Sequence, residues 1–250
     1  MIESIIKTLE SQIADDSFAV FDFDNSCVVN DIQEAVLAYC IRHQLLKDKT
    51  LVQEYDLEEY HKKVLLHYYS LLDQQQTEAA YVYAIEIMAG FTKEEIFKIT
   101  KEAIIEEGSE IGKQDLLGIE IGKGIKLREQ VIELLNELQK RGVDIWVVTA
   151  SFGEVVKNAL SHFNIKAQCV GMRLEEQNGV YLKNVLKPYS TLEGKVTCIQ
   201  KYINPTTPPL IGVGDSVNDL AMLEYANYKA VVNRGNKLTD IAREKGWFLI

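Results

Sequence analysis

The chain contains the stretch AVFDFDNS at residues 19–26, in which an apolar run ends in two aspartates one residue apart. Side chains alternate between the two faces of a strand, so Asp22 and Asp24 share a face if the strand continues. If the chain turns at the strand end, both carboxylates line a pocket there. Paired carboxylates suit Mg²⁺, a hard cation that takes oxygen ligands in near-octahedral geometry. Because Asp-x-Asp pairs are also common in turns, this pair alone does not identify a site.

Three further motifs follow the aspartate pair along the chain. The apolar run IWVVTAS at residues 145–151 ends in hydroxyl residues. Lys195 opens a helical pattern ahead of a third apolar run. That third run is LIGVGDSVND at residues 210–219, and it brings a second acidic pair, Asp215 and Asp219, to a glycine-flanked strand end. Two of these motifs, like the aspartate pair, place polar groups directly after an apolar run.

In this order, the aspartate pair, the hydroxyl, the lysine and the second acidic pair resemble the motifs of the haloacid dehalogenase superfamily of phosphohydrolases. The similarity is greatest to the phosphoserine phosphatase-like branch, and the motifs span residues 22–219. Ser26 departs from the family pattern, which more often has threonine at that position, but the hydroxyl is retained. The resemblance implies a phosphatase that uses Mg²⁺ and hydrolyses a small phosphorylated metabolite through an aspartyl-phosphate.

The resemblance also implies a role for each motif residue. Asp22 is expected to be the nucleophile, and Asp24 the acid/base that protonates the leaving oxygen and later accepts a proton from water. The residues expected to bind phosphate are Thr149, Lys195 and Asn218. Thr149 is preferred to Ser151 because the hydroxyl of the family follows the apolar run directly.

The ligands that the resemblance implies for Mg²⁺ are the carboxylates of Asp22 and Asp215 and the backbone carbonyl of Asp24. Asp219 is expected to support the site by holding Lys195 or a metal-bound water. Asp219 also suits the N-cap of the helix that follows, and the two roles are compatible.

The charge of the chain limits its partners. The 250 residues include 37 acids and 27 bases, which gives a formal net charge of −10. This balance disfavours nucleic acid, whose phosphates are bound by clustered Lys and Arg, and anionic membranes for the same reason. A phosphorylated metabolite stays compatible, because a metal and a few basic groups dominate the field of a small pocket. The sequence is equally compatible with a monomer and a dimer.

Residues 1–15 alternate isoleucine and leucine with charged residues, which predicts an amphipathic helix instead of a signal peptide. No segment approaches the ~20 apolar residues of a membrane span. The four cysteines show no Cys-x-x-Cys spacing, so neither a zinc site nor a dithiol centre is expected. These features predict a cytoplasmic protein with reduced thiols.

The middle of the chain has a helical pattern, with candidate helices at residues 31–46, 56–72, 77–89 and 92–107. Thr92 and Glu95 form a capping box at the start of the last one. On either side, helices alternate with apolar strands, which predicts an α/β fold with a doubly wound parallel sheet and sites at the carboxyl ends of its strands. We therefore expect a Rossmann-like catalytic core of residues 1–30 and 122–250. The resemblance implies that residues 31–121 form an all-helical cap of the C1 type.

The strands of the core are expected near residues 19–21, 143–148, 209–213, 229–232 and 247–250. Two further runs, joined at Asn178 and Gly179, predict a β-hairpin over residues 172–183. A stripe of apolar residues from Leu127 to Leu138 predicts the helix before the second strand.

The choice of substrate depends on the cap. Asp31 lies nine residues after the expected nucleophile, where phosphoserine phosphatases have a glutamate that binds the substrate amine. Asp31 and Glu34 equally fit a capping pair at a helix start, so both interpretations stand. Arg42 is the only arginine between residues 31 and 121, which argues against phosphoserine because a carboxylate needs a basic partner.

The cap is instead rich in tyrosine, and most of these side chains are expected to pack in its core. They are Tyr39, Tyr55, Tyr60, Tyr68, Tyr69, Tyr81 and Tyr83. Aromatic faces together with acids suit a cationic head group, so phosphocholine or phosphoethanolamine is expected to be a better substrate than phosphoserine.

Two other functions share most of this pattern. A phosphotransferase or mutase would use the same aspartyl-phosphate and differ in its acceptor. A non-catalytic protein that binds a phosphorylated metabolite has no need for the intact set of Asp22, Asp24, Lys195 and Asp215, and this set favours an enzyme. A dehalogenase has no need for an acid at position 24.

Overall fold

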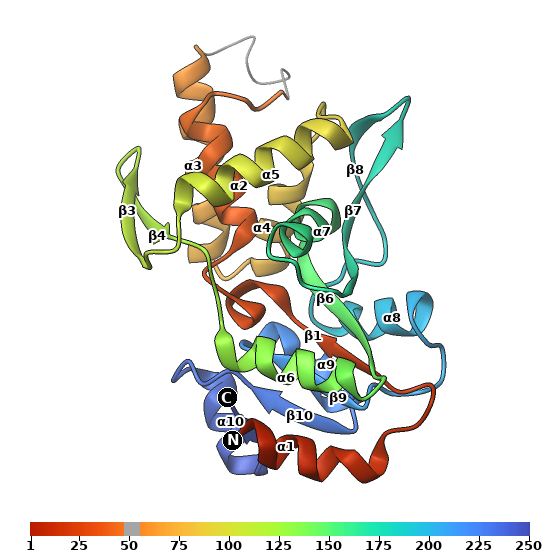
Figure 1. Ribbon diagram of the computed structural model, residues 1–250. Coiled ribbons are helices and arrows are strands. Elements are labelled where there is room, and N and C mark those ends of the chain that lie inside the picture. Colours follow the sequence, from red (N-terminus) through yellow and green to blue (C-terminus); the bar gives the residue numbers. More distant parts are fainter. Residues whose placement is uncertain (48–55) are drawn as a thin grey trace.

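A seven-stranded sheet forms the centre of the core in the computed structural model, which describes residues 1–47 and 56–250 (Figure 1). In spatial order its strands are β11 (Phe248–Leu249), β10 (Tyr228–Val231), β9 (Ile211–Gly214), β1 (Phe18–Phe21), β6 (Asp144–Phe152), β7 (Gln168–Gln177) and β8 (Val180–Leu186). Neighbouring strands are parallel except β7 and β8, which form the expected antiparallel hairpin. The order runs in both directions from β1, which confirms the doubly wound sheet.

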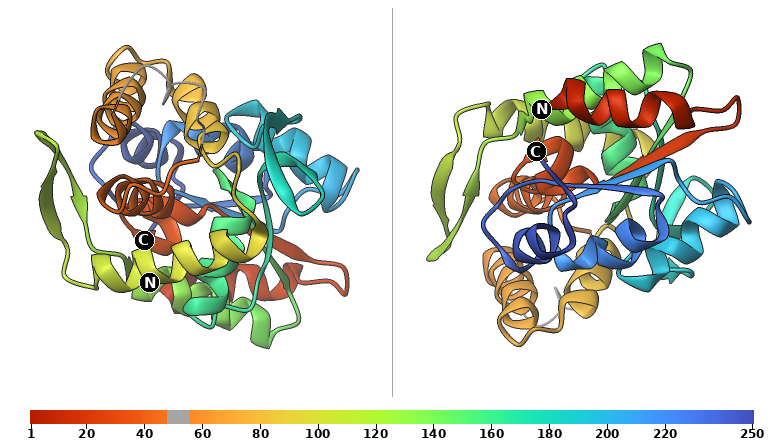
Figure 2. Two further views of the ribbon diagram at one scale, coloured as in Figure 1. Left: turned by 90° about the horizontal axis from the view of Figure 1, so that it is seen from above. Right: turned by 90° about the horizontal axis from the view of Figure 1, so that it is seen from below.

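Helices cover both faces of this sheet, and the alternation of side chains along β1 shows which face meets which helices. Ala19 and Phe21 belong to one buried cluster with residues of α1 (Ile2–Leu9), α6 (Glu129–Lys140) and α7 (Gly153–His162). Phe18 and Val20 belong to another cluster, with residues of α8 (Glu193–Tyr202) and α9 (Leu220–Tyr225). The helix α10 (Lys237–Lys245) packs on β10 and β11, and Figure 2 shows the two helical layers on opposite sides of the strands.

The N-terminal helix α1 is amphipathic, as the sequence predicts. Its buried residues Ile2, Ile5, Ile6 and Leu9 share one side, and α1 packs against α6. Among the helices of the described residues, none combines the length and the apolar character needed to cross a membrane.

Four helices make up most of the inserted block, close to the expected ranges. They are α2 (Ile32–Arg42), α3 (Leu57–Asp73), α4 (Thr77–Glu86) and α5 (Lys93–Glu107). Their first turns are capped by residues that the sequence marks: Asp31 and Asp56 each accept a backbone N–H, and Thr92 with Glu95 forms a complete capping box. Of the cap tyrosines, Tyr55 lies outside the described residues.

The expectation of an all-helical cap is wrong at its C-terminal end. The strands β3 (Gly112–Leu116) and β4 (Ile119–Lys123) form an antiparallel hairpin that projects from the end of α5 (Figures 1 and 2). Most of its residues are exposed, so the alternation of apolar and polar residues that predicts a strand is missing. Its turn is formed by Leu117 and Gly118, both in the left-handed region with φ 54° and 86°.

Two segments that lie far apart in the sequence connect the helical block to the core. The strand β2 (Val28–Val29) pairs with β5 (Lys126–Leu127), and the Asn30 side chain donates to the carbonyls of Lys123 at 2.8 Å and Gly124 at 2.9 Å. These connections lie where the sequence places them. The division into a core of residues 1–30 and 122–250 and a cap of residues 31–121 stays a prediction about independent units.

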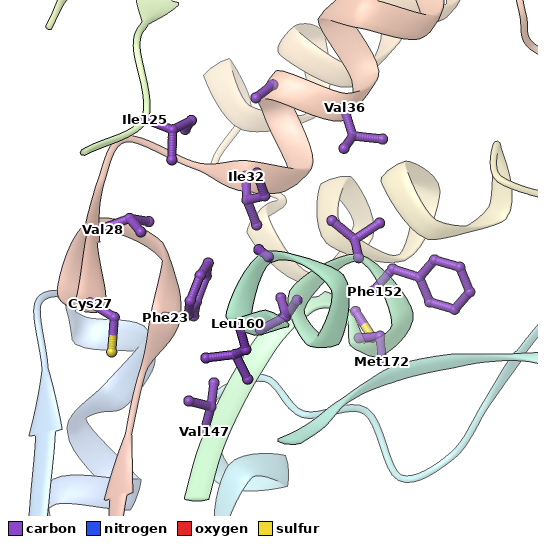
Figure 3. Close-up of a cluster of buried hydrophobic side chains, with 14 of the residues drawn as sticks. Phe23, Cys27, Val28, Ile32, Val36, Ile125, Val147, Phe152, Leu160 and Met172 are labelled. Carbon is purple, nitrogen blue, oxygen red and sulfur yellow. The ribbon is translucent and has the colours of Figure 1, made fainter. Parts of the chain in front are cut away.

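One apolar cluster continues from the core through the connections into the cap (Figure 3). It includes Val147 and Leu160 of the core, Val28 and Ile125 of the connecting segments, and Val36 of α2. All five are at most 3% exposed. Shared burial of this kind fixes the position of α2 above the carboxyl ends of the strands.

Candidate active site

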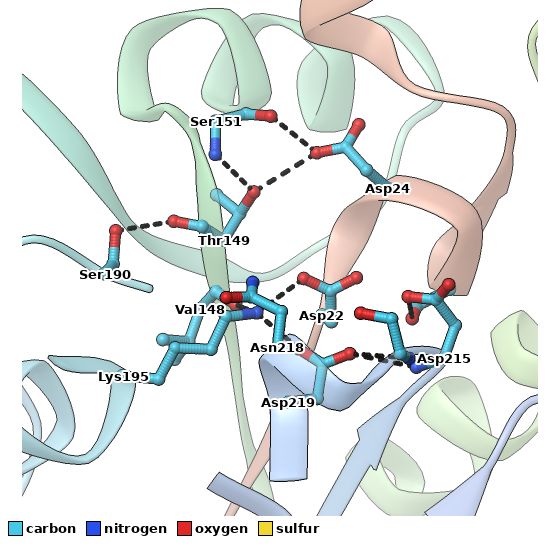
Figure 4. Close-up of polar contacts among 12 residues, drawn as sticks. Asp22, Asp24, Val148, Thr149, Ser151, Ser190, Lys195, Asp215, Asn218 and Asp219 are labelled. Carbon is cyan, nitrogen blue, oxygen red and sulfur yellow. Dashed lines mark hydrogen bonds and ion pairs between the residues drawn. The ribbon is translucent and has the colours of Figure 1, made fainter. Parts of the chain in front are cut away.

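The expected site residues gather at one edge of the sheet (Figure 4). Asp22 directly follows β1, Asp215 directly follows β9, and Thr149 lies near the end of β6. The carboxyl ends of parallel neighbours meet at the same edge, and β9, β1 and β6 are adjacent in the sheet. The Asp22 N–H donates to the Val213 carbonyl at 2.8 Å, which continues the sheet up to the site.

Lys195 is fully buried and uses all three of its ammonium protons. Its Nζ donates to Asp22 Oδ1 at 2.7 Å, to Asp219 Oδ1 at 2.6 Å and to the Val148 carbonyl at 2.9 Å. Burial by itself lowers the pKa of Lys195, but the Asp219 and Asp22 carboxylates outweigh it and hold the pKa above its ordinary value. The lysine is therefore a permanent positive charge against Asp22.

Asp22 has one oxygen bonded to Lys195 and one oxygen, Oδ2, that accepts no hydrogen bond from any described residue. Burial raises the pKa of Asp22 well above its ordinary value, the neighbouring Asp219 raises it further, and Lys195 opposes both. The carboxylate thus lies in an excess of negative charge, with a free oxygen on a residue that lines a cavity.

Asp24 is bonded on both oxygens. Its Oδ1 accepts the Ile32 N–H at 2.7 Å. Its Oδ2 accepts the Ser151 hydroxyl at 2.7 Å and the Thr149 hydroxyl at 3.2 Å, as Figure 4 shows. Burial raises the pKa of Asp24 to about 7, the nearby Asp31 adds to the shift, and the Ser151 hydrogen bond opposes it. Near neutral pH both protonation states are accessible, as a residue that first gives and then takes a proton requires.

The hydroxyl expected to bind phosphate lies behind the cavity wall. Thr149 is fully buried; it donates to Asp24 and accepts the Ser151 N–H at 3.0 Å. Ser151 and Ala150 line the cavity instead. The structure therefore puts Ser151, which the sequence ranks second, closer to a ligand than Thr149.

Asp219 supports its neighbours with both of its oxygens. Oδ1 accepts from Lys195, and Oδ2 accepts the backbone N–H groups of Asp215 at 3.0 Å and Ser216 at 3.2 Å. Gly214 makes room for this contact, since a Cβ there would lie 2.6 Å from the Asp219 Cβ. Asp219 thus has the supporting geometry that the resemblance implies.

Asp215 has two partners that the sequence does not place beside it. Its Oδ2 accepts from Arg234, and its Oδ1 accepts the Ser26 hydroxyl at 3.3 Å. Burial raises the pKa of Asp215 to about 6, Asp219 adds to the shift, and Arg234 opposes it. Arg234 follows β10, which no motif marks, and only the pairing of β10 with β9 would predict its position.

A three-residue segment before α8 ties the site together and is also unmarked in the sequence. The Ser190 hydroxyl donates to the Thr149 carbonyl at 2.6 Å, and the Thr191 hydroxyl donates to Glu78 of α4 at 2.7 Å. The Leu192 N–H donates to Asn218 Oδ1 at 2.9 Å. Asn218, expected at the phosphate, both lines the cavity and anchors the segment that leads to Lys195.

Two cavities meet at the site. The first has a volume of about 100 Å³, and its lining residues include Asp22, Asp24, Asp31, Tyr81, Ser151, Asp215, Asn218 and Arg234. The second has a volume of about 190 Å³, and its lining residues include Asp31, Glu34, Glu107, Gly122 and Arg234. Because Asn25, Asp31 and Arg234 line both, the second cavity is a continuation of the first toward the connecting segments.

Asp31 and Glu34 are partly buried acids; Asp31 lines both cavities and Glu34 lines the second. Asp31 Oδ1 caps α2 by accepting the Glu34 N–H at 2.9 Å, and Glu34 Oε1 accepts the Tyr68 hydroxyl at 3.1 Å. Burial raises the pKa of Asp31 to about 7, with Glu34 adding to the shift, and burial also raises the pKa of Glu34. Within residues 1–47 and 56–250, no lysine or arginine forms an ion pair with either acid. A cationic ligand would therefore supply the positive charge that these two carboxylates lack.

The acidic cluster fits a hard divalent cation. Carboxylate oxygens of Asp22, Asp215 and Asp219 lie within 4.8 Å of one another. Since Asp219 is committed to Lys195 and two backbone amides, the carboxylates that suit direct ligation are Asp22 and Asp215. These carboxylates are desolvated and repel one another, and all of their donor atoms are oxygens. Mg²⁺ binds oxygen ligands and would offset the repulsion.

Two curated proteins are similar to this chain in sequence. The chain is 26% identical over 246 residues to the histidinol-phosphatase of Neisseria meningitidis serogroup C, covering 92% of this chain and 96% of that protein. It is 23% identical over 209 residues to the phosphorylcholine phosphatase of Pseudomonas aeruginosa, covering 78% of this chain and 56% of that protein.

Solved structures share the fold. A functionally unknown protein from Anaerococcus prevotii superposes with a TM-score of 0.74 at 21% identity, covering 99% of this chain and 91% of that one. A substrate-bound phosphoserine phosphatase superposes with a TM-score of 0.56 at 18% identity, covering 94% of this chain and 92% of that one.

A family model settles the relationship that the motifs indicate. The model for haloacid dehalogenase-like hydrolases matches residues 19–224, a range that contains every expected site residue. The resemblance seen in the sequence is thereby confirmed. The chain belongs to the haloacid dehalogenase-like hydrolase family, as an enzyme of its phosphohydrolase type.

Proposed function

We propose that this enzyme is a Mg²⁺-dependent phosphatase that hydrolyses small phosphomonoesters through an aspartyl-phosphate on Asp22. The observation that carries the proposal is the arrangement around Asp22, a cavity-lining residue that has one oxygen bonded to the buried Lys195 and one oxygen that accepts no hydrogen bond from the described residues. Asp24 lies on the same wall, with a pKa raised to about 7 by burial. A nucleophile and an acid/base thus meet where a phosphate ester would enter.

In the first step, Asp22 Oδ2 attacks the phosphorus, and the bond from phosphorus to the ester oxygen breaks. The Asp24 carboxylic acid gives its proton to that departing oxygen, which leaves as an alcohol. In the second step, the Asp24 carboxylate takes a proton from water, whose oxygen attacks the phosphorus of the aspartyl-phosphate. The bond to Asp22 breaks, inorganic phosphate leaves, and both aspartates return to their starting state.

Mg²⁺ held by Asp22, Asp215 and the Asp24 carbonyl would supply positive charge to the phosphoryl oxygens. Lys195 contributes a second positive charge and holds Asp22 in place through its three hydrogen bonds. Asp219 orients Lys195, while Ser151 and Asn218 are the polar groups on the wall available to the phosphoryl oxygens.

We assign the substrate to the phosphomonoesters whose leaving alcohol carries an amine or ammonium group, such as phosphocholine, phosphoethanolamine or phosphoserine. Asp31 and Glu34 bring partly buried carboxyl groups to the second cavity, Asp31 also lines the first, and Tyr81 adds an aromatic side chain to the wall of the first. The substrates named by the two curated relatives, histidinol phosphate and phosphorylcholine, also carry basic or cationic nitrogen. Arg234 is an arginine that lines both cavities, but its guanidinium is bonded to Asp215, so phosphocholine and phosphoethanolamine stay preferred to phosphoserine.

A phosphate-release screen over phosphorylated metabolites, with and without Mg²⁺, tests this proposal. We expect turnover that a chelator abolishes, and water as the only acceptor. Asp22→Asn should lose turnover while keeping the melting temperature of the wild type, because a carboxamide cannot form the covalent intermediate. Undiminished activity of this variant would overturn the role of Asp22, and phosphate transfer to an added alcohol would make the enzyme a phosphotransferase.

A further inference from the structure

Arg234 reaches the site from a segment that carries none of the family motifs. The strands β9 and β10 are parallel neighbours with Gly214 beside Val231, so both end at the same edge. Asp215 is the first residue after β9, and Arg234 is the third residue after β10. The Val232 N–H donates to the Gly214 carbonyl at 2.9 Å, which carries the pairing past the end of β10.

The segment around Arg234 is fixed to Asp215 at two points. The Arg234 guanidinium donates to the Asp215 carboxylate, and the Asn236 amide donates to the Asp215 backbone carbonyl at 2.8 Å. Asn236 also caps α10 by accepting the Thr239 N–H at 3.1 Å, so its side chain is held on both ends. Gly235 between them has φ +64°, a conformation that lets the chain turn back toward the site. Arg234 is therefore a built part of the site, although its side chain is 38% exposed.

The charges at the site divide into two groups. Lys195 compensates Asp22 and Asp219, and its three protons are all used, none of them on Asp215. Arg234 is the basic group bonded directly to Asp215, on which Lys195 acts without a hydrogen bond; the Asp215 side chain is 5% exposed and is one of the two carboxylates suited to ligate Mg²⁺. Arg234 also lines both cavities, where a phosphate ester and its leaving group would lie.

We propose that Arg234 competes electrostatically with Mg²⁺ for Asp215 and at the same time strengthens the binding of the phosphate dianion. The proposal rests on the proposed function, since it concerns the same metal and the same phosphate. A positive charge bonded to a ligand lowers the affinity of that ligand for a cation, and the same charge attracts an anion at the adjacent wall. The planar guanidinium also matches two phosphate oxygens at once, which a lysine cannot do.

Titration calorimetry with Mg²⁺ alone, on the wild type and on Arg234→Gln, measures the first half of the proposal. We expect the variant to bind Mg²⁺ about tenfold more tightly, the order that Coulomb's law gives for a unit charge and a divalent cation a few ångströms apart at the dielectric constant of water. The difference should shrink as KCl is raised, because added salt screens a half-exposed charge. Arg234→Lys, which keeps the charge, should retain the affinity of the wild type within about threefold.

Inhibition by inorganic phosphate measures the second half. The inhibition constant for phosphate should rise about tenfold in Arg234→Gln, so the variant changes the two affinities in opposite directions. Arg243→Gln is the matched control. Arg243 lies on α10 and pairs with the exposed Asp240, so this substitution removes the same charge at a position away from the site. The control should leave both affinities unchanged, and thermal unfolding of each variant checks that it is folded.

The outcomes separate this inference from the proposed function. If the wild type binds Mg²⁺ and releases phosphate, but Arg234→Gln binds Mg²⁺ equally or more weakly, then Arg234 orients Asp215 and the inference is overturned alone. An equal gain of affinity in Arg243→Gln overturns it as well, since the effect then reflects net charge. A wild type that neither binds Mg²⁺ nor releases phosphate overturns the proposed function, and the inference with it.

Discussion

Asp24 is the residue on which separate parts of the chain converge. It accepts hydrogen bonds from Ile32, at the start of the cap helix α2, and from Thr149 and Ser151 of β6. Those donors stabilise the carboxylate, yet burial outweighs them and raises the pKa of Asp24 to about 7. The pKa of Asp24 therefore depends on how tightly the segments around it exclude water.

The raised pKa of Asp24 predicts how stability changes with pH. In the folded state Asp24 keeps its proton up to about pH 7, whereas its ordinary pKa is 3.8. Between these two pH values the folded state binds a proton at Asp24 that the unfolded state has released. The protonation of Asp24 therefore contributes fully to the free energy of unfolding below pH 3.8. This contribution declines as the pH rises and is lost above pH 7. Asp24→Asn cannot titrate. Its free energy of unfolding relative to the wild type, measured in urea with a chelator, should rise across this interval and level off above it. Parallel pH curves for the two proteins would contradict the raised pKa.

Glu34 offers a test of the leaving-group assignment that leaves the helix cap intact. Asp31 caps α2 through the backbone N–H of Glu34, so a change of the Glu34 side chain does not remove that bond. Glu34→Gln should lower kcat/KM for phosphocholine or phosphoethanolamine about tenfold, because a negative charge at the cavity wall is lost. An aryl phosphate without an amine should be hydrolysed at nearly the rate of the wild type. Equal losses on both substrates would assign Glu34 to the structure of the cap.

At the scale of elements, the start of α8 controls the position of Lys195. Gly194 lies so close to the preceding loop that a Cβ there would be 2.0 Å from the Tyr189 carbonyl oxygen. Gly194→Ala should therefore shift the first turn of α8, cost about 1–3 kcal/mol of stability, and reduce phosphate release at least tenfold by moving Lys195. Gly112→Ala is the matched control, because nothing lies within 4 Å of its Cβ position. Urea unfolding and the aryl phosphate assay distinguish the two, and equal behaviour of both variants would refute the steric argument.

The elements that the sequence predicts well are those whose signals are local. Capping residues such as Asp31 and Thr92 mark where cap helices begin, because a side chain there satisfies a backbone N–H of its own helix. The hairpin β3–β4 is unmarked, since both of its faces are mostly exposed and no apolar alternation is needed. Arg234 is unmarked for another reason. Its role depends on which strand lies beside β9, and strand order is a property of the assembled sheet.

The same reasoning explains the relation of Thr149 to Ser151. The order of motifs indicates a hydroxyl at the end of β6, and two hydroxyls are present there. Which of them faces the cavity depends on the local path of the strand, and the pairing of β6 with β7 shifts register between Val148 and Phe152. A register shift redirects side chains without leaving a signal in the sequence.

At the scale of the whole molecule, the core and the cap share one apolar cluster. Val147 and Leu160 of the core are in the same cluster as Val36 and Ile32 of α2. We therefore expect one calorimetric unfolding transition, with equal calorimetric and van't Hoff enthalpies. Val36→Ala should lower the temperature of that single transition, at a cost on the order of 2 kcal/mol, without splitting it. Two transitions, with only the lower one moved by the variant, would show that the cap unfolds on its own.

The central position of β1 has a consequence for the synthesis of the protein. Its neighbours β6 and β9 begin at residues 144 and 211, so the first strand to leave the ribosome is among the last to be enclosed. At roughly 5–20 residues per second, Asp22 waits about 10–40 s for Lys195, Asp215 and Asp219 to be made. During that time the apolar residues of β1 lack both neighbouring strands, and the nascent chain is open to chaperones and to aggregation. Slow synthesis of residues 22–219 would prolong this exposure, so we expect the yield of folded enzyme to fall when translation is slowed, even though the final stability is unchanged.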